Sequence, residues 1–202
     1  MRIGVLALQG DFSEHAAILR RLGMELSEPI DVVEIRTALQ LSQVDGLIIP
    51  GGESTTIGKL MLDCGLLDPL RKRVAAGMPV FGTCAGAIVL ARDIGGLSQP
   101  LIGLMNLSIR RNAFGRQRES FETSLQVPAL GEPPLRAVFI RAPAITSVGE
   151  GVEVLARLQD GTIVAARQGR MLAAAFHPEL TGDTRLHRYF VDLVRSSLAR
   201  AA

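Results

Sequence analysis

The sequence predicts an α/β protein with three layers, in which helices cover both faces of a mostly parallel central sheet. Two observations indicate this fold. Over the first 95 residues, short apolar runs rich in β-branched residues alternate with helix patterns. After Gly96, strand patterns follow one another with too little sequence between them for crossover helices. We therefore expect the parallel sheet first and an antiparallel extension toward the C-terminus.

The first half of the chain divides into strands and helices at clear punctuation. We expect a helix over 13–23, with Ser13 as its N-cap and Gly23 as its stop. A second helix has Asp68 as its cap, Pro69 in its first turn and Gly77 at its end. A third helix is expected over 84–95. The expected strands cover residues 3–8, 32–36, 45–52 and 80–83.

Strand patterns dominate the second half. Asp160-Gly161 is a two-residue hairpin signal, and Gln168–Arg170 is another turn candidate. A last helix is expected from about Asp183 to Ala201. The expected strands cover residues 104–111, 119–128, 136–143, 152–158, 162–168 and 171–176.

Composition limits the class of protein. The 202 residues are 48% hydrophobic with a mean hydropathy of +0.28, as expected for one well-packed domain over residues 1–202. No apolar run is long enough for a membrane span, and the N-terminus lacks a secretory cleavage pattern. The net charge of +2 predicts no nucleic-acid partner. Two cysteines form no disulfide framework, which favours the cytoplasm, and we interpret Cys64 as a core residue.

The stretch 79–91, PVFGTCAGAIVLA, contains the most informative motif. Cys84 lies between Gly82 and Gly86, which is the pattern of a nucleophile elbow with Cys in place of Ser. The nucleophile of an elbow has a strained backbone at a strand-to-helix turn, where neighbouring side chains would clash. A helix N-terminus favours the thiolate, and the Ala85 N–H would point to a developing oxyanion. The alternative is a small buried cysteine in a glycine-rich turn.

A thiol nucleophile needs a base, and the chain has three histidines. His15 and His187 fall in predicted helices and are consistent with ordinary surface or packing positions. His177 ends an apolar strand, and Glu179 follows two residues later. In an extended segment these two side chains face the same side, so the carboxylate can orient the imidazole. Cys84, His177 and Glu179 are therefore the candidate catalytic residues.

The stretch 48–55, IIPGGEST, is the third candidate element. Two glycines after a parallel strand place backbone N–H groups at the carboxyl edge of the sheet, where α/β proteins bind ligands. Gly51 and Gly52 can bring a second N–H to the oxyanion site, and Glu53 can meet a substrate ammonium. The alternative is a plain turn with Ser54 or Thr55 capping the next helix. The spacing does not fit a phosphate-binding Walker loop.

With these motifs in view, the chain resembles the triad-type, class I glutamine amidotransferases, which have a flavodoxin-like sheet. More narrowly, it is similar to the glutaminase subunits of two-component pyridoxal 5′-phosphate synthases. The elbow and HPE at 177–179 are general to the class, whereas PGGEST at 50–55, RNAFGRQ at 111–117 and FIRAP at 139–143 are specific to the pyridoxal branch. The resemblance covers nearly the whole chain. One position departs from it, because Ala113 replaces the usual serine.

The resemblance implies hydrolysis of glutamine to glutamate and ammonia through a thioester on Cys84, with no cofactor and no metal. His177 would move protons, Glu179 would orient it, and the N–H groups of Gly52 and Ala85 would form the oxyanion hole. The glutamine-binding positions implied by the resemblance are Gly51, Gly52, Glu53, Arg111, Ile140 and Arg141. An arginine and a glutamate suit the carboxylate and ammonium of an amino acid, although Arg111 and Arg141 could instead form structural ion pairs.

The resemblance also implies a partner, a (β/α)8-barrel synthase subunit that would receive the ammonia in a hetero-oligomer. Gln9, in the LQG segment at 8–10, is a candidate contact with it. We interpret GRQRES at 115–120 as a solvated or subunit-contact loop rather than a nucleic-acid patch. The stretch 24–31 is longer than the family usually carries, which leaves its local structure open.

Two other classes of function stay open on sequence grounds. A peptide or ester hydrolase could use Ser54 as its nucleophile, but Thr55 stands where an elbow needs glycine. A scaffold that has lost its chemistry would be expected to lack one of the three triad residues, and all three are present.

Overall fold

The computed structural model describes residues 1–114 and 120–200. Its main sheet has a parallel half with the strand order β2-β1-β3-β4-β12. This is the flavodoxin-like order, and it confirms the predicted fold class. The bounds are β1 Arg2–Leu6, β2 Asp31–Ile35, β3 Gly46–Ile49, β4 Val80–Thr83 and β12 Met171–Ala174.

The mostly antiparallel extension continues the same sheet beyond β12, in the order β11-β9-β6-β5, with β10 paired to β11 and only β5 parallel to its neighbour β6. The extension is therefore joined to the parallel half through the β11–β12 pair. Strand β12 itself belongs to the parallel half because it pairs with β4. Strand β9 was not anticipated. Strands β7 and β8 form a separate two-stranded sheet. The bounds are β5 Ala91–Asp93, β6 Met105–Arg110, β7 Ser120–Leu125, β8 Leu135–Ile140, β9 Ala144–Val148, β10 Val152–Arg157 and β11 Ile163–Gln168.

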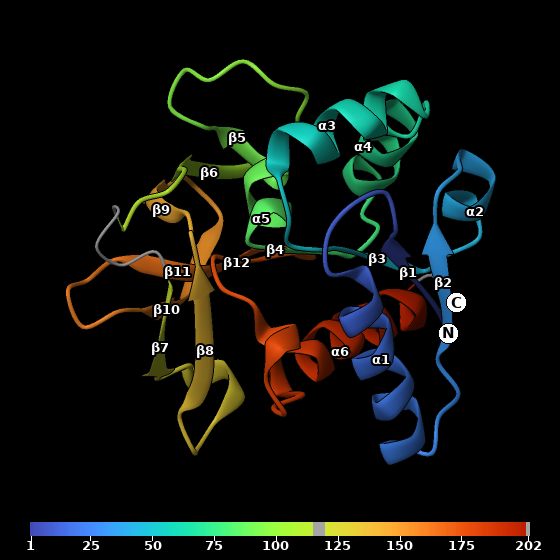
Figure 1. Ribbon diagram of the computed structural model, residues 1–202. Helices are drawn as coiled ribbons and strands as arrows, with labels where there is room; N and C mark the ends of the chain where they lie inside the picture. The colour runs from blue at the N-terminus through green and yellow to red at the C-terminus, as the bar shows by residue number, and fades with distance from the viewer. Residues whose placement is uncertain (115–119, 201–202) are drawn as a thin grey trace.

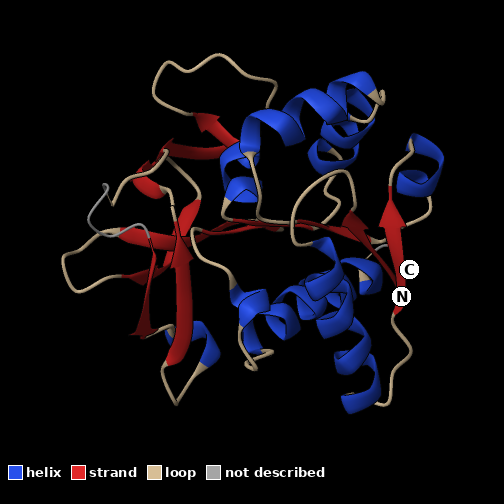
Figure 2. Ribbon diagram, viewed as in Figure 1, coloured by secondary structure: helices blue, strands red, loops and turns tan. Residues whose placement is uncertain are grey.

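Helices cover both faces of the parallel half, as Figures 1 and 2 show. One face packs against α1 and α6 and the other against α2 to α5, each through its own cluster of buried apolar side chains. Alternate strand residues feed the two clusters: Ile48 joins the first and Leu47 the second. The bounds are α1 Phe12–Glu25, α2 Ala38–Ser42, α3 Ser54–Asp63, α4 Leu67–Ala75, α5 Ala85–Leu90, α6 Arg185–Ala199, and the 3₁₀ turns η2 Pro128–Leu130 and η3 Pro178–Leu180.

The first helix differs from its prediction at both ends. Its N-cap is Asp11 rather than Ser13, and the Asp11 side chain makes no cap hydrogen bond. The helix passes Gly23 and ends at Glu25. A side chain at Gly23 would bring its Cβ within 3.2 Å of the Ile30 backbone nitrogen, so this glycine permits the close return of the chain rather than ending the helix. The long 24–31 stretch thus folds back against α1.

Three other local predictions also need correction. Helix α4 begins at Leu67, so Asp68 lies in its first turn and pairs with Arg71 instead of capping it. The predicted helix over 84–95 ends at Leu90, because the next three residues pair with β6 as strand β5. Cys64 is exposed at the end of α3 and is no core residue.

Several boundary predictions agree with the structure. Gly77 follows the end of α4 with φ of +96°, and the last helix lies within its expected range. Both predicted hairpin turns form, although the Asp160-Gly161 loop is longer than two residues because the Leu158 N–H donates to the Thr162 carbonyl. Within the described ranges, every helix is too short or too polar to cross a membrane.

Candidate active site

Cys84 lies at the carboxyl end of β4, between that strand and α5, with φ of +46° and ψ of −103°. This backbone is strained for a residue with a side chain. The two flanking glycines make it possible. A Cβ at Gly82 would lie 2.5 Å from the Gly86 carbonyl, and one at Gly86 would lie 2.1 Å from the Ile49 carbonyl oxygen. The elbow geometry therefore depends on both glycines, as the motif requires.

His177 follows β12 and faces Cys84 across the end of the sheet. Its backbone N–H donates to the Val138 carbonyl oxygen of β8 over 2.8 Å. Its Nδ1 lies 2.6 Å from Oε1 of Glu179. The segment after His177 is the 3₁₀ turn η3 and not the extended strand that we expected, and the turn still brings the two side chains together. All three candidate triad residues are buried.

The electrostatics of this group favour a charged imidazole. Burial lowers the pKa of His177, but hydrogen bonds and charge from Cys84 and Glu179 outweigh burial and raise it to about 10. Burial raises the pKa of the Glu179 carboxyl, which His177 opposes. A thiol beside an imidazolium ion is the arrangement that activates cysteine as a nucleophile.

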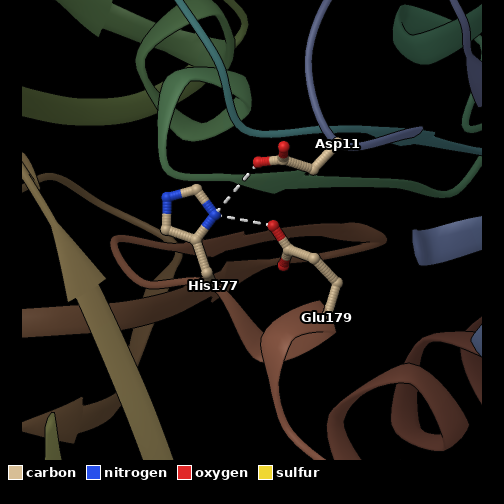
Figure 3. Close-up of side chains that lie close together, drawn as sticks. All are labelled: Asp11, His177 and Glu179. Atoms are coloured by element: carbon tan, nitrogen blue, oxygen red, sulfur yellow. Dashed lines mark hydrogen bonds and ion pairs between the residues drawn. The ribbon is translucent and has the colours of Figure 1, made fainter. Parts of the chain in front are cut away.

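Asp11 brings a second carboxylate, after that of Glu179, to the same histidine (Figure 3). Its Oδ2 lies 3.5 Å from Nδ1 of His177. The side chain that does not cap α1 therefore faces the active site instead. The ligand atoms of Asp11, His177 and Glu179 lie within 4.8 Å of one another, near enough to hold a cation. Because Glu179 already holds Nδ1 at 2.6 Å, we interpret the cluster as a hydrogen-bonded imidazole and not as a metal centre.

A cavity of about 510 Å³ opens in front of Cys84 and His177. This volume suits a small-molecule substrate. Most of the predicted binding residues lie around it, but Gly51 does not line it. A Cβ at Gly51 would lie 2.4 Å from Cε1 of His177, so this glycine gives the imidazole room. The other lining residues are Gln9, Asp11, Gly52, Glu53, Ser54, Ala85, Ile88, Arg111, Asn112, Ile140, Arg141 and Pro143.

Glu53 and Arg111 pair with each other at the wall of this cavity. Arg111 Nη2 donates to Oε1 of Glu53 over 2.8 Å. The Glu53 carboxylate also caps α3 by accepting the backbone N–H groups of Thr55 and Thr56. Burial raises the pKa of Glu53, but these hydrogen bonds and Arg111 lower it to about 2. The cap of α3 is thus Glu53 rather than Ser54 or Thr55.

The side chain of Gln9 packs against the loop formed by Gly51 and Gly52. Its Oε1 accepts the Glu53 backbone N–H over 2.8 Å. Gly52 has φ of +146°, and a Cβ there would lie 2.5 Å from the same oxygen. The side chain of Gln9 therefore fixes the backbone of Gly52, which carries one of the two N–H groups expected to meet an oxyanion.

Two buried histidines near the triad were not anticipated as more than helix residues. His15 and His187 are fully buried and hydrogen-bonded to each other, and His15 also lies 3.4 Å from Oε2 of Glu179. No spacing in the sequence links them to His177. The segment GRQRES, predicted to be a contact loop, falls almost entirely outside the described residues, as its first five positions are 115–119.

Ser54, the alternative nucleophile, lies on the cavity wall at the start of α3. Its hydroxyl is 3.4 Å from Gln99, and its side chain contacts no base in the described part of the chain. The fold and the geometry of the site fit a different class: thiol-dependent acyl-transfer enzymes, with Cys84, His177 and Glu179 as the candidate triad at the carboxyl edge of a flavodoxin-like sheet.

Comparison with known proteins narrows this class. Residues 5–196 match the model of the SNO glutamine amidotransferase family, and the chain belongs to that family. A pyridoxal 5′-phosphate synthase subunit PdxT of Pelotomaculum thermopropionicum is 60% identical over 95% of this chain and 94% of its own length. The subunit of the same name from Herpetosiphon aurantiacus is 59% identical, over 96% of this chain and the whole of its own.

Solved structures agree with this assignment. A crystal structure of a glutamine amidotransferase is 54% identical, with a TM-score of 0.88 over 96% of this chain and 98% of that one. The structure of PurLQS from Thermotoga maritima contains a chain with a TM-score of 0.64 at 14% identity, over 99% of this chain and 97% of that one. At that identity the second likeness concerns the fold alone.

Proposed function

We propose that this chain is the glutaminase subunit of a pyridoxal 5′-phosphate synthase and that it supplies the ammonia for vitamin B6 synthesis. The observation that carries the proposal is the buried Cys84–His177–Glu179 group at the end of a cavity of about 510 Å³. Family membership supports glutamine as the substrate. The name of the relatives supports pyridoxal phosphate as the product of the complex.

The chemistry follows from the charges at the site. The Cys84 thiolate attacks the side-chain amide carbon of glutamine, and the N–H groups of Gly52 and Ala85 receive the charge that develops on the amide oxygen. His177, as imidazolium, protonates the leaving nitrogen, and the C–N bond breaks to give ammonia and a thioester. His177 then takes a proton from water as the water attacks the thioester. The C–S bond then breaks, glutamate leaves, and the Cys84 thiolate and His177 imidazolium are restored.

The charged residues that line the cavity suit the amino-acid end of glutamine. Glu53 offers a carboxylate to the ammonium group, and Arg111 and Arg141 offer guanidinium groups to the carboxylate. Ile140, about one-third exposed, gives an apolar wall for the methylene groups. The pairing of Glu53 with Arg111 supports this proposal, because it holds both charged groups at the cavity before substrate arrives.

The proposed partner is a (β/α)8-barrel synthase subunit that receives the ammonia, and we place the complex in the cytoplasm. Gln9 is the proposed contact, since it lies at the cavity and holds the loop of Gly52. A partner that moves Gln9 would move an oxyanion donor with it, which would couple turnover to assembly. The whole chain, residues 1–202, would act as one glutaminase domain.

The proposal is tested by labelling the purified chain with a chloroketone analogue of glutamine. We expect one covalent label on Cys84, protection by glutamine, and no label in Cys84→Ala. A peptide or ester hydrolase would label without protection by glutamine. A scaffold would give no selective label, and either result would contradict the proposal.

A further inference from the structure

A buried polar chain continues from the triad into the core between α1 and α6. Nε2 of His15 lies 3.4 Å from Oε2 of Glu179 and 3.1 Å from Oγ1 of Thr83. Nδ1 of His15 lies 2.8 Å from Nε2 of His187. Both histidines are fully buried, and the Phe81 ring flanks them edge-on. Two imidazoles in an otherwise apolar core are costly unless their nitrogens are paired.

The pairing selects one arrangement of protons. Nδ1 of His187 makes no hydrogen bond to any described residue. If His15 donated to His187, Nδ1 of His187 would carry a buried N–H without an acceptor, and a bare nitrogen of His15 would face the Glu179 carboxylate. If His187 donates through Nε2, its unpaired Nδ1 carries no hydrogen. Nε2 of His15 then carries an N–H that can donate to Oγ1 of Thr83 and also faces Oε2 of Glu179, 3.4 Å away. The second arrangement leaves fewer unsatisfied groups.

Both imidazoles are neutral in this arrangement. Burial, with the nearby His187 and His177, holds the pKa of His15 well below its usual range. Burial and the charge of Arg21 lower the pKa of His187 to about 3. The neutral chain can therefore donate hydrogen bonds toward Glu179 without placing a second positive charge beside His177.

We propose that His15 is a positioning residue for the triad, whose Nε2–H holds the free oxygen of Glu179, and that His187 fixes the tautomer of His15. The inference rests on the proposed glutaminase chemistry. Glu179 has two carboxylate oxygens: Oε1 holds His177 at 2.6 Å, and Oε2 has no hydrogen-bond partner among the described residues, with Nε2 of His15 3.4 Å away. An N–H toward Oε2 keeps the carboxylate ionised and prevents its rotation. His177 then keeps its Nε2 directed toward the thiol.

The test compares two replacements of similar size at His15. His15→Gln keeps a terminal N–H that can reach Oε2, whereas His15→Met fills the space without a donor. Leu19→Ala is the matched control, because Leu19 is fully buried one turn further along α1 and belongs to the apolar cluster that contains Phe81. Thermal unfolding of each variant measures the structural cost. Two activity readouts are then made, with partner synthase present for the first.

In glutamate release, we expect kcat of His15→Met to fall about 10- to 100-fold with KM nearly unchanged, as for a misplaced catalytic group. His15→Gln should keep most of the wild-type kcat. Leu19→Ala should lower the melting temperature without a comparable loss of kcat. In alkylation of Cys84 by iodoacetamide, the pH midpoint should rise by about one unit in His15→Met. Glu179 then holds His177 less firmly, so the His177 imidazolium stabilises the Cys84 thiolate less.

An unchanged or lower midpoint in a folded His15→Met protein would overturn the inference, as would equal kcat losses in His15→Met and His15→Gln. The iodoacetamide readout does not involve glutamine. If wild type releases no glutamate but its alkylation midpoint still depends on His15, the proposed function fails and the positioning role stands.

Discussion

Gly51→Ala should disable the active site without adding anything to the substrate cavity. The new methyl carbon would lie 2.4 Å from Cε1 and 2.9 Å from Nδ1 of His177. Carbon atoms pack at about 3.5 Å or more, so the imidazole must move by about 1 Å. That displacement breaks the 2.6 Å contact with Glu179 and misaligns His177 with Cys84. A misplacement of about 1 Å costs roughly 100-fold in rate, or about 2.7 kcal/mol of transition-state stabilisation.

The assay is glutamate release at saturating glutamine and partner, with thermal unfolding to show that the variant folds. The loss should fall on kcat, because the methyl group displaces His177; a loss confined to KM would mean that Gly51 contacts glutamine instead. Gly182→Ala is the matched control, since nothing lies within 4 Å of its added Cβ. A folded Gly51→Ala protein with kcat within about threefold of wild type would refute the reasoning.

Three further predictions follow from the same contacts. Glu179→Gln should lower kcat by at least about 100-fold, since it removes the charge that orients His177, and retention of full kcat would contradict this. Folding raises the pKa of His177 from 6.5 to about 10, so protonated His177 stabilises the fold fully below pH 6.5, and this stabilisation is lost as the pH rises through 10. The unfolding free energy measured in urea should therefore fall over this pH range in wild type and fall less steeply in His177→Gln. Glu53→Ala should raise the KM for glutamine and lower the unfolding free energy by about 1 kcal/mol, because the cap of α3 is lost; unchanged KM would remove Glu53 from the binding site.

The fold could be predicted because local signals agreed with the long-range arrangement. A Cβ added at Gly82 or Gly86 would lie 2.5 Å or 2.1 Å from backbone atoms, so only glycine fits at both positions. The elbow motif therefore indicates this local geometry from the sequence alone. The helix over 84–95 was predicted too long because its apolar pattern is the same in a buried helix and a buried strand. Only the pairing of β5 with β6 separates them, and that pairing joins residues distant in sequence.

Candidate site residues could be inferred where a local motif marks them, and not where a residue joins the site only through contacts that no motif marks. His177 and Glu179 are two residues apart, and their relation was visible as a motif. Asp11 was not visible, because no motif links it to His177 and only the structure shows its side chain turned to that histidine. His15 and His187 are 172 positions apart, and no pattern within either helix predicts their contact.

The central claim is tested most directly by glutamate release from glutamine, measured for wild type and Cys84→Ala, alone and with a pyridoxal 5′-phosphate synthase partner subunit. We expect turnover by wild type that the partner stimulates strongly, and none by Cys84→Ala in either condition. No turnover by wild type in a mixture where the two proteins are shown to bind would contradict the account.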